Sequence, residues 1–230
     1  MAMVDLKREG EVFILTMQNG ENRFNRLFIE AMNQALDTVE QSSGPAALVT
    51  VGGEEKFYSN GLDLAWLIGD GLKERKEFIP AVLRFLGRVM AFPVPTVAAI
   101  TGHAFAAGAM LALAHDFRVM RADRGFFCLP EVDIKIPFAP GMTALIKSRL
   151  PPVTLRDLML TGMRVGGSEA KERGIVDEAV SADQVLPRAI GRAAALANKD
   201  RKVYQTIKRG MYADALTLLE SGVADLSQLD

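Results

Sequence analysis

A strand that turns into a helix through very small side chains is the feature that most constrains how this chain can fold. Residues 96–100 form an apolar, β-like run, and residues 101–108 (Thr-Gly-His-Ala-Phe-Ala-Ala-Gly) lead into an apolar helical pattern that continues to Ala114. The first N–H groups of a helix have no acceptor within it and lie at the positive end of its dipole. They suit an anion or a polarised carbonyl oxygen, which small side chains allow to approach closely. The turn can therefore supply part of an oxyanion hole.

Small-residue turns also occur wherever a helix packs tightly on a sheet, so one such turn does not define a site. A second segment of the same kind strengthens the functional interpretation. The apolar run 47–51 is followed by residues 57–64 (Phe-Tyr-Ser-Asn-Gly-Leu-Asp-Leu), which turn through Ser-Asn-Gly into a helix that we expect to begin near Asp63. Asp63 is a typical N-cap residue. Two such turns can each direct one N–H toward the same carbonyl oxygen.

The rest of the chain alternates apolar, strand-like runs with helical patterns. Strands are predicted at residues 12–17, 47–51, 96–100 and 117–120, and helices at 27–39, 74–90, 154–160 and 168–173. The first helix is expected to bury one face, which consists of Leu27, Ala31, Met32, Ala35, Leu36 and Val39. Ser168 is expected to cap the last of these helices and Gly174 to end it. Strands separated by helices favour parallel βαβ units and an α/β fold.

The composition limits the classes of partner. With 230 residues, of which 49% are hydrophobic, the chain can bury the core of one domain, or of one domain and a tail. Its net charge of −1 offers no attraction to nucleic acid or to an anionic membrane. A single cysteine excludes an internal disulfide framework, and no apolar run has the form of a signal peptide or a membrane span. We therefore expect a soluble intracellular protein without nucleic-acid or membrane partners.

The two turn segments carry a family resemblance. Residues 57–66 and 102–133 resemble the paired signatures of the crotonase (enoyl-CoA hydratase/isomerase) superfamily, and within it the plant-type Δ3,Δ2-enoyl-CoA isomerases, which share the Ser-Asn-Gly turn and an Ala-rich second turn. The resemblance implies a spiral of ββα units over residues 1–183, holding the coenzyme A and acyl site, and a C-terminal helical trimerisation region over residues 184–230. It also implies a homotrimer or hexamer. The Ala-, Lys-, Arg- and Leu-rich tail by itself indicates a pair of helices packed on their own subunit.

The resemblance assigns the oxyanion-hole donors to the backbone N–H groups of Leu62 and Ala107. Hydratases of this superfamily use two glutamates to bind and activate water; here Met110 occupies the first of these positions and Glu131 the second. One base can move a double bond by taking a proton from C2 and returning it to C4, whereas addition of water profits from two carboxyl groups. The resemblance therefore implies isomerisation rather than hydration, with Glu131 as the catalytic base and Met110 drying the pocket.

Glu131 lies among apolar residues in the sequence, so we expect burial to raise its pKa and make it a stronger base. An isolated Pro-Glu pair would more often cap a turn or bind a lysine such as Lys135. Asp133 is a spare candidate, expected to act as a structural hydrogen-bond acceptor.

An acyl-CoA thioester is the expected ligand. By resemblance, the residues that bind it are Ser59, Asn60, Gly61, Asp63, Leu64, Trp66, Gly108 and Phe138. Its phosphates suit Arg23, Arg26, Lys56 and, from a neighbouring subunit, Lys208, although each is equally an ordinary surface charge. The acyl chain needs apolar walls, for which the candidates are Trp66, Phe78, Leu83, Phe138 and Met142.

No cofactor is expected beyond the coenzyme A of the substrate, and no metal. His103, His115 and Cys128 show no known ligand spacing, and both histidines are expected in the core or beside the site. Asp116 is expected to be structural. The sequence contains neither a dinucleotide fingerprint nor a phosphate-binding loop.

The sequence thus predicts an enzyme that converts 3-enoyl-CoA to trans-2-enoyl-CoA in fatty-acid β-oxidation. Two alternatives stay open: another one-acid reaction of the superfamily, such as acyl-CoA hydrolysis or decarboxylation, and a catalytically silent CoA-binding protein. Plant-type relatives imply a peroxisome. The chain ends in Ser-Gln-Leu-Asp rather than a Ser-Lys-Leu-like address, so the cytoplasm is the alternative compartment.

Overall fold

A strand of a large sheet is followed three times by a strand of a small sheet and then by helices in the computed structural model, which describes residues 2–224. The first unit consists of β3 (Ala47–Gly52), β4 (Phe57–Ser59), α2 (Leu64–Ile68) and α3 (Arg75–Met90). The second consists of β5 (Thr96–Ile100), β6 (His103–Phe105) and α4 (Ala107–Ala114). The third consists of β7 (Phe117–Arg121), β8 (Phe126–Cys128), α5 (Glu131–Ile134) and α6 (Pro140–Arg149). The predicted α/β spiral of ββα units is confirmed.

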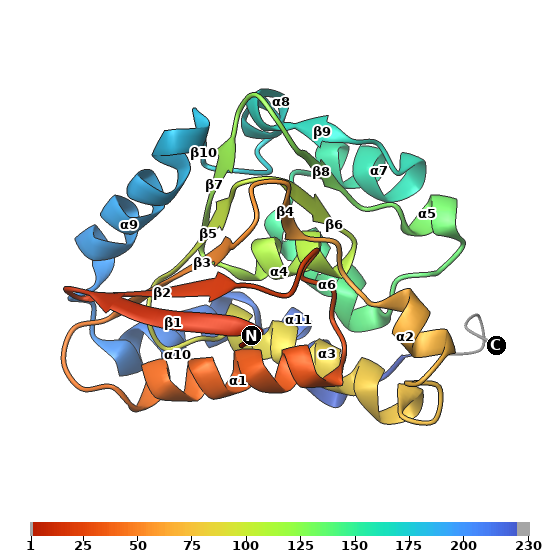
Figure 1. Cartoon of the computed structure of the whole chain (residues 1–230), viewed down its shortest axis with the longest axis horizontal. Helices are drawn as coiled ribbons and strands as arrows, with labels where there is room; N and C mark the ends of the chain where they lie inside the picture. Colours follow the sequence, from red (N-terminus) through yellow and green to blue (C-terminus); the bar gives the residue numbers. More distant parts are fainter. Residues whose placement is uncertain (1, 225–230) are drawn as a thin grey trace.

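The arrangement of the two sheets brings the turns before α2 and α4 close to each other. The large sheet has the order β1-β2-β3-β5-β7-β10, in which only β1 (Val4–Glu9) is antiparallel to its neighbour β2 (Val12–Met17). The small sheet has the order β4-β6-β8-β9, with β9 (Val165–Gly166) antiparallel to β8. Figure 1 shows β4, β6 and β8 side by side above α4. Because β4 and β6 run in parallel, the turns that follow them meet at one edge.

The hydrophobic core lies on both faces of the large sheet, as continuous apolar strands require. The main cluster packs one face against α1 (Arg26–Gln41), α3, α4, α6 and α11 (Ala213–Ser221). A second cluster on the other face joins Val49, Val97 and Val119 to Ala189 and Ala193 of α9 (Val185–Leu196). Figure 1 shows α9 alone on that side, with α1, α3 and α11 opposite.

Two local predictions are wrong. Leu27 is 54% exposed, because the buried face of α1 begins with Phe28 and Ile29. Ser168 does not cap α8 (Gly167–Glu172); the helix begins one residue earlier, with Gly166 as its cap. Gly167 packs against the backbone of β7, where a Cβ would lie 2.1 Å from the carbonyl oxygen of Arg121. Helix α7 (Pro152–Thr161) and the end of α8 before Gly174 (φ +70°) agree with the sequence.

The tail packs on its own subunit through three helices: α9, α10 (Arg201–Met211) and α11. Lys208 of α10 is buried, and its Nζ lies 2.8 Å from Asp116 Oδ1. The Asp116 carboxylate also accepts from the N–H of Thr96 (2.9 Å) and the hydroxyl of Tyr204 (3.1 Å). Asp116 is therefore structural, as predicted. Lys208 is not free to reach the phosphates of a ligand in another subunit, so that prediction is wrong.

Strand β10 (Glu178–Val180) and a 3-10 turn, Ala182–Gln184, connect the spiral to these helices. Residues 227–230, which we expect not to form a peroxisomal address, lie outside the described residues. Among residues 2–224, no helix combines the length and the apolar composition that crossing a membrane requires.

Candidate active site

The first turn, which follows β4, requires glycine at position 61. Gly61 has φ +76°, and a Cβ there would lie 2.9 Å from the backbone nitrogen of Ala107. The Gly61 N–H donates to Ser59 Oγ (3.2 Å), and the Ser59 hydroxyl donates to the carbonyl of Asn22 (2.7 Å). Asp63 caps α2 with its side chain, as predicted. Ser59, Gly61 and Asp63 therefore shape the turn.

A short parallel bridge orients the amide of Leu62. The Phe24 N–H donates to the carbonyl of Gly61 (2.7 Å), and the Phe24 carbonyl accepts from the N–H of Asp63 (2.9 Å). Parallel pairing of this kind uses the groups on either side of residue 62, so the N–H of Leu62 itself points away from Phe24. Within residues 2–224 this N–H has no backbone acceptor.

The second amide belongs to Ala107, the first residue of α4, whose N–H has no acceptor within the helix. The preceding residue, Ala106, has φ +51° and ψ −126°, a conformation that residues with a Cβ rarely adopt. Because the ψ of Ala106 sets the plane of the next peptide, this strained conformation determines where the Ala107 N–H points. Sequence reasoning missed Ala106, since alanine carries no signal for positive φ.

The two turns touch through their backbones. A Cβ on Gly108 would lie only 2.3 Å from the carbonyl oxygen of Ser59, so only glycine lets α4 approach β4 this closely. The parallel pairing of Phe57 with His103 holds the two strands in register. Leu62 and Ala107 thus lie on adjacent turns and line the same cavity.

Glu131 begins α5 and lines this cavity as well. Its side chain is 6% exposed, and Oε2 has no hydrogen-bond partner in the described part of the chain. Burial raises the pKa of Glu131 from its ordinary 4.5 to about 7. A hydrogen bond from its own backbone N–H acts against this shift, and Lys135 does not contribute to it. Asp133 is exposed and does not line the cavity. Glu131 is therefore a buried carboxyl group whose basicity exceeds that of an ordinary glutamate.

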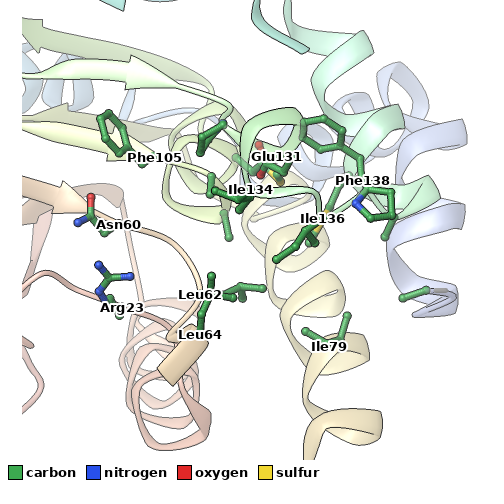
Figure 2. A pocket seen from close by; sticks show the side chains of 18 of the residues that line it. Arg23, Asn60, Leu62, Leu64, Ile79, Phe105, Glu131, Ile134, Ile136 and Phe138 are labelled. Atoms are coloured by element: carbon green, nitrogen blue, oxygen red, sulfur yellow. The ribbon is translucent and has the colours of Figure 1, made fainter. Parts of the chain in front are cut away.

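The cavity has a volume of about 490 Å³ and two chemically different ends. Figure 2 shows Arg23, Asn60 and Phe105 on one side of Glu131 and Ile79 and Phe138 on the other. Among the lining residues within 2–224, Glu131 is the only acid and Arg23 the only base. Met110 lies in the wall and contributes an apolar thioether there. The arrangement can hold a polarised carbonyl oxygen and remove a proton beside it.

The predicted binding residues divide between the cavity and its support. Asn60, Leu64, Phe138 and Met142 line it, whereas Ser59, Gly61, Asp63 and Gly108 lie behind the lining. The predicted acyl walls Trp66, Phe78 and Leu83 are wrong. The Trp66 ring packs edge-on against Phe78, with centroids 4.9 Å apart, and Leu83 is a core residue. Ile79, Ile136 and Pro137, which were not predicted, form the wall instead.

Of the basic candidates, only Arg23 lines the cavity. It is paired with Glu21, with Nη2 and Oε2 2.6 Å apart. Arg26 pairs with Glu30 and Glu74, and Lys56 is exposed outside the lining. Arg23 is thus the positive charge at the polar end.

The remaining candidates lie elsewhere. His103 accepts from the N–H of Phe126 (3.2 Å) on the small sheet and does not line the cavity. His115 is fully buried, as predicted for a core histidine. Burial raises the pKa of the Cys128 thiol to about 11. Within the described residues, no group of three or more His, Cys, Asp or Glu side chains is arranged to hold a metal ion.

The chain belongs to the enoyl-CoA hydratase/isomerase family, whose model matches residues 7–228. Enoyl-CoA delta isomerase 3 of Arabidopsis thaliana is 33% identical over 227 residues, which make up 95% of each chain. Carnitinyl-CoA dehydratase of Escherichia coli K12 is 32% identical over 184 residues, covering 77% of this chain and 69% of that protein.

Solved structures of the family superpose closely. An enoyl-CoA isomerase of Mtb has a TM-score of 0.88, and an enoyl-CoA hydratase of Mycobacterium marinum one of 0.87. Both are 26% identical to this chain and cover 96% of it, over 96% of their own length. Because the relatives differ in reaction, the reaction of this chain must be argued from its site.

Replacing Glu131 with glutamine should change how stability depends on pH. With a pKa of about 7, the folded protein prefers the neutral carboxyl. Its free energy of unfolding therefore falls as the pH rises from 4.5 through 7, by about 3 kcal/mol in total. Glu131→Gln lacks this loss, so its stability relative to wild type should grow by that amount between pH 4.5 and 8 in urea unfolding. If the free energies of unfolding of wild type and variant change in parallel with pH, the carboxyl is not buried in its neutral form.

Replacing Ala106 with glycine should stabilise the protein. A residue with a Cβ in this conformation costs about 1–3 kcal/mol, and glycine removes that cost while losing about 0.5–1 kcal/mol to unfolded-state entropy. The expected net gain is about 1 kcal/mol in the free energy of unfolding. Ala109→Gly in the same helix is the control and should lower stability by about 1 kcal/mol. A lower free energy of unfolding in both variants would contradict the strain at Ala106.

Proposed function

We propose that this protein is a Δ3,Δ2-enoyl-CoA isomerase, which converts 3-enoyl-CoA to trans-2-enoyl-CoA in fatty-acid breakdown. The observation that supports this most is that Glu131, the one acid among the described lining residues, shares a buried cavity wall with Leu62 and Ala107, whose N–H groups have no backbone acceptor within residues 2–224. The names of the Arabidopsis relatives agree with this reaction.

The proposed reaction needs only these groups. The N–H groups of Leu62 and Ala107 bind the thioester oxygen, and Glu131 takes a proton from C2. The electrons move into a dienolate whose negative charge lies on that oxygen, where two fixed donors stabilise it. Glu131 then returns the proton to C4, and the double bond shifts to C2–C3. The reaction is redox-neutral overall and requires no cofactor beyond the coenzyme A of the substrate.

Two features of the cavity favour isomerisation over addition of water. Hydration profits from two carboxyl groups that hold and activate a water molecule, and here Met110 lines the wall where the resemblance places the second. Apolar side chains such as Ile79, Ile136 and Phe138 also exclude water from the acyl end. The basicity of Glu131, raised by burial, matches the proton transfer to carbon that isomerisation needs.

The ends of the cavity assign the orientation of the substrate. Arg23 and Asn60 make one end polar, which suits the coenzyme A part of the thioester. Ile79, Phe138 and Met142 make the other end apolar, which suits the acyl chain. The thioester carbonyl then lies between them, at Leu62 and Ala107.

Purified protein should convert 3-hexenoyl-CoA to the conjugated 2-enoyl product, which is followed by ultraviolet absorbance. Glu131→Gln should lower kcat about 10³-fold, because no other acid among the described residues lines the cavity. In wild type, kcat/KM should fall tenfold per unit below pH about 7, since a protonated Glu131 cannot accept a proton.

Asp133→Asn is the matched control for the isomerisation assay. It removes an exposed carboxyl group two residues away and should leave the rate unchanged. Conjugation that survives Glu131→Gln would remove Glu131 from the mechanism. Release of free thiol without conjugation would indicate thioester hydrolysis, and binding of acyl-CoA without turnover would indicate a silent protein.

We also propose self-association through α10, in line with the expected trimer or hexamer. Val203, Ile207 and Met211 recur every four residues on one face of α10 and are 55–66% exposed. Ile207→Glu should convert the oligomer to monomers in analytical ultracentrifugation, because it places a charge in an apolar contact. Thr206→Glu adds the same charge beside this stripe and should leave the oligomer intact. Unchanged mass for Ile207→Glu would exclude this face.

A further inference from the structure

A continuous chain of hydrogen bonds lies behind the cavity, between β3, β4 and α4. Tyr58 Oη is 2.8 Å from Thr50 Oγ, and Thr50 Oγ is 3.0 Å from His115 Nε2. His115 Nδ1 is 2.8 Å from the carbonyl oxygen of Leu111. All three side chains are almost completely buried. None of them lines the cavity, and the proposed reaction uses none of them.

While His115 is neutral, the donors and acceptors in this series of hydrogen bonds can be arranged in only one direction. A carbonyl oxygen only accepts, so His115 Nδ1 carries the proton and Nε2 is an acceptor. The Thr50 hydroxyl must then donate to Nε2, which leaves Thr50 Oγ to accept from the hydroxyl of Tyr58. Burial lowers the pKa of His115 to about 4, with Lys208 and Arg118 acting in the same direction and Asp116 against it. The direction is therefore fixed at neutral pH.

The chain joins the two segments that carry the proposed oxyanion-hole donors. Tyr58 lies in β4, four residues before Leu62, and His115 closes the eight-residue helix that begins with Ala107. Besides the backbone contacts of the two turns, the hydroxyl of Thr50 on β3 links them through this series of hydrogen bonds. Because a short helix moves as one body, a bond that fixes its last turn also fixes the direction of its first amide.

We infer that Thr50 is a positioning residue, which sets the spacing of the Leu62 and Ala107 amides by linking Tyr58 to His115. This role rests on the proposed oxyanion hole. Thr50 contacts no substrate, and it acts through the two elements that carry the donors. Loss of the link should weaken the binding of charge on the thioester oxygen more than the binding of the neutral ligand.

The test compares Thr50→Val, which keeps the shape but removes the hydroxyl, with Thr50→Ser, which keeps the hydroxyl. Thr50→Val should lower kcat for 3-hexenoyl-CoA about tenfold with KM within twofold, and Thr50→Ser should stay within twofold of wild type. Tyr58→Phe should have a smaller effect, since Thr50 can still donate to His115. The double variant should cost no more than Thr50→Val, because the groups act as one chain.

A second measurement separates positioning from simple loss of stability and from the identity of the reaction. Acetoacetyl-CoA ionises to an enolate with charge on the thioester oxygen, whereas butyryl-CoA does not. The ratio of their dissociation constants reports how strongly the two amides favour a charged thioester oxygen over a neutral one, without any turnover. Thr50→Val should reduce the preference for the enolate about tenfold, and Thr50→Ser should preserve it.

Tyr204→Phe is the matched control, since it removes a part-buried hydroxyl bound to Asp116 (3.1 Å) away from both turns. It should lower stability but leave kcat and the ligand ratio unchanged. Unchanged kcat per folded molecule and an unchanged ratio in Thr50→Val would overturn the positioning role. Wild type could lack isomerase activity while Thr50→Val still lowers the preference for acetoacetyl-CoA over butyryl-CoA. In that case the proposed reaction fails and the positioning role stands.

Discussion

Backbone contact between two turns is the constraint on which the rest of this structure depends. Gly61 and Gly108 stand where a Cβ would come within 2.9 and 2.3 Å of backbone atoms of the other turn. Such contact is possible only if β4 and β6 are parallel neighbours and each leads at once into a helix. The ββα spiral meets both requirements, because the large-sheet strands β3, β5 and β7 are each continued by a strand of the small sheet.

The site carries local costs that the core must offset. Ala106 occupies a conformation that suits glycine, and Glu131 buries a carboxyl oxygen that has no partner among residues 2–224. Each disfavours the folded state by an amount on the order of 1–3 kcal/mol. Apolar clusters on both faces of the large sheet supply the compensating stability. Such costs concentrate where a backbone amide must be aimed or a base kept poorly solvated, and here both lie in the wall of one cavity.

The sequence predicts those parts of the fold that follow from local chemistry. The buried strands at 12–17 and 96–100 are continuous apolar runs and agree to the residue, and Asp63 caps its helix as its type suggests. Strand β1 was not predicted, because four of its six residues are charged and none of the six is fully buried. The sequence does not indicate that Lys208 pairs with Asp116 in the core, because the two residues are 92 positions apart. Some residues predicted to line the acyl pocket do not line the cavity, because helical spacing does not tell which side of a helix faces it. Phe78 was therefore predicted, and its neighbour Ile79 was missed.

The choice between isomerisation and hydration depends on few side chains, because both reactions need the same oxyanion hole. Addition of water profits from a nucleophile held between two acids, so we expect Met110, at the position of one of them, to disfavour hydration while leaving the enolate chemistry intact. Burial raises the pKa of the remaining carboxyl, Glu131, to about 7. For the reaction that we propose, Met110 and Glu131 act in the same direction, because an apolar wall excludes water and a more basic carboxylate favours proton transfer from carbon. Relatives named as a hydratase, a dehydratase and isomerases are similar to this chain at 26–33% identity, so we expect the groups at positions 110 and 131, rather than overall similarity, to decide its reaction.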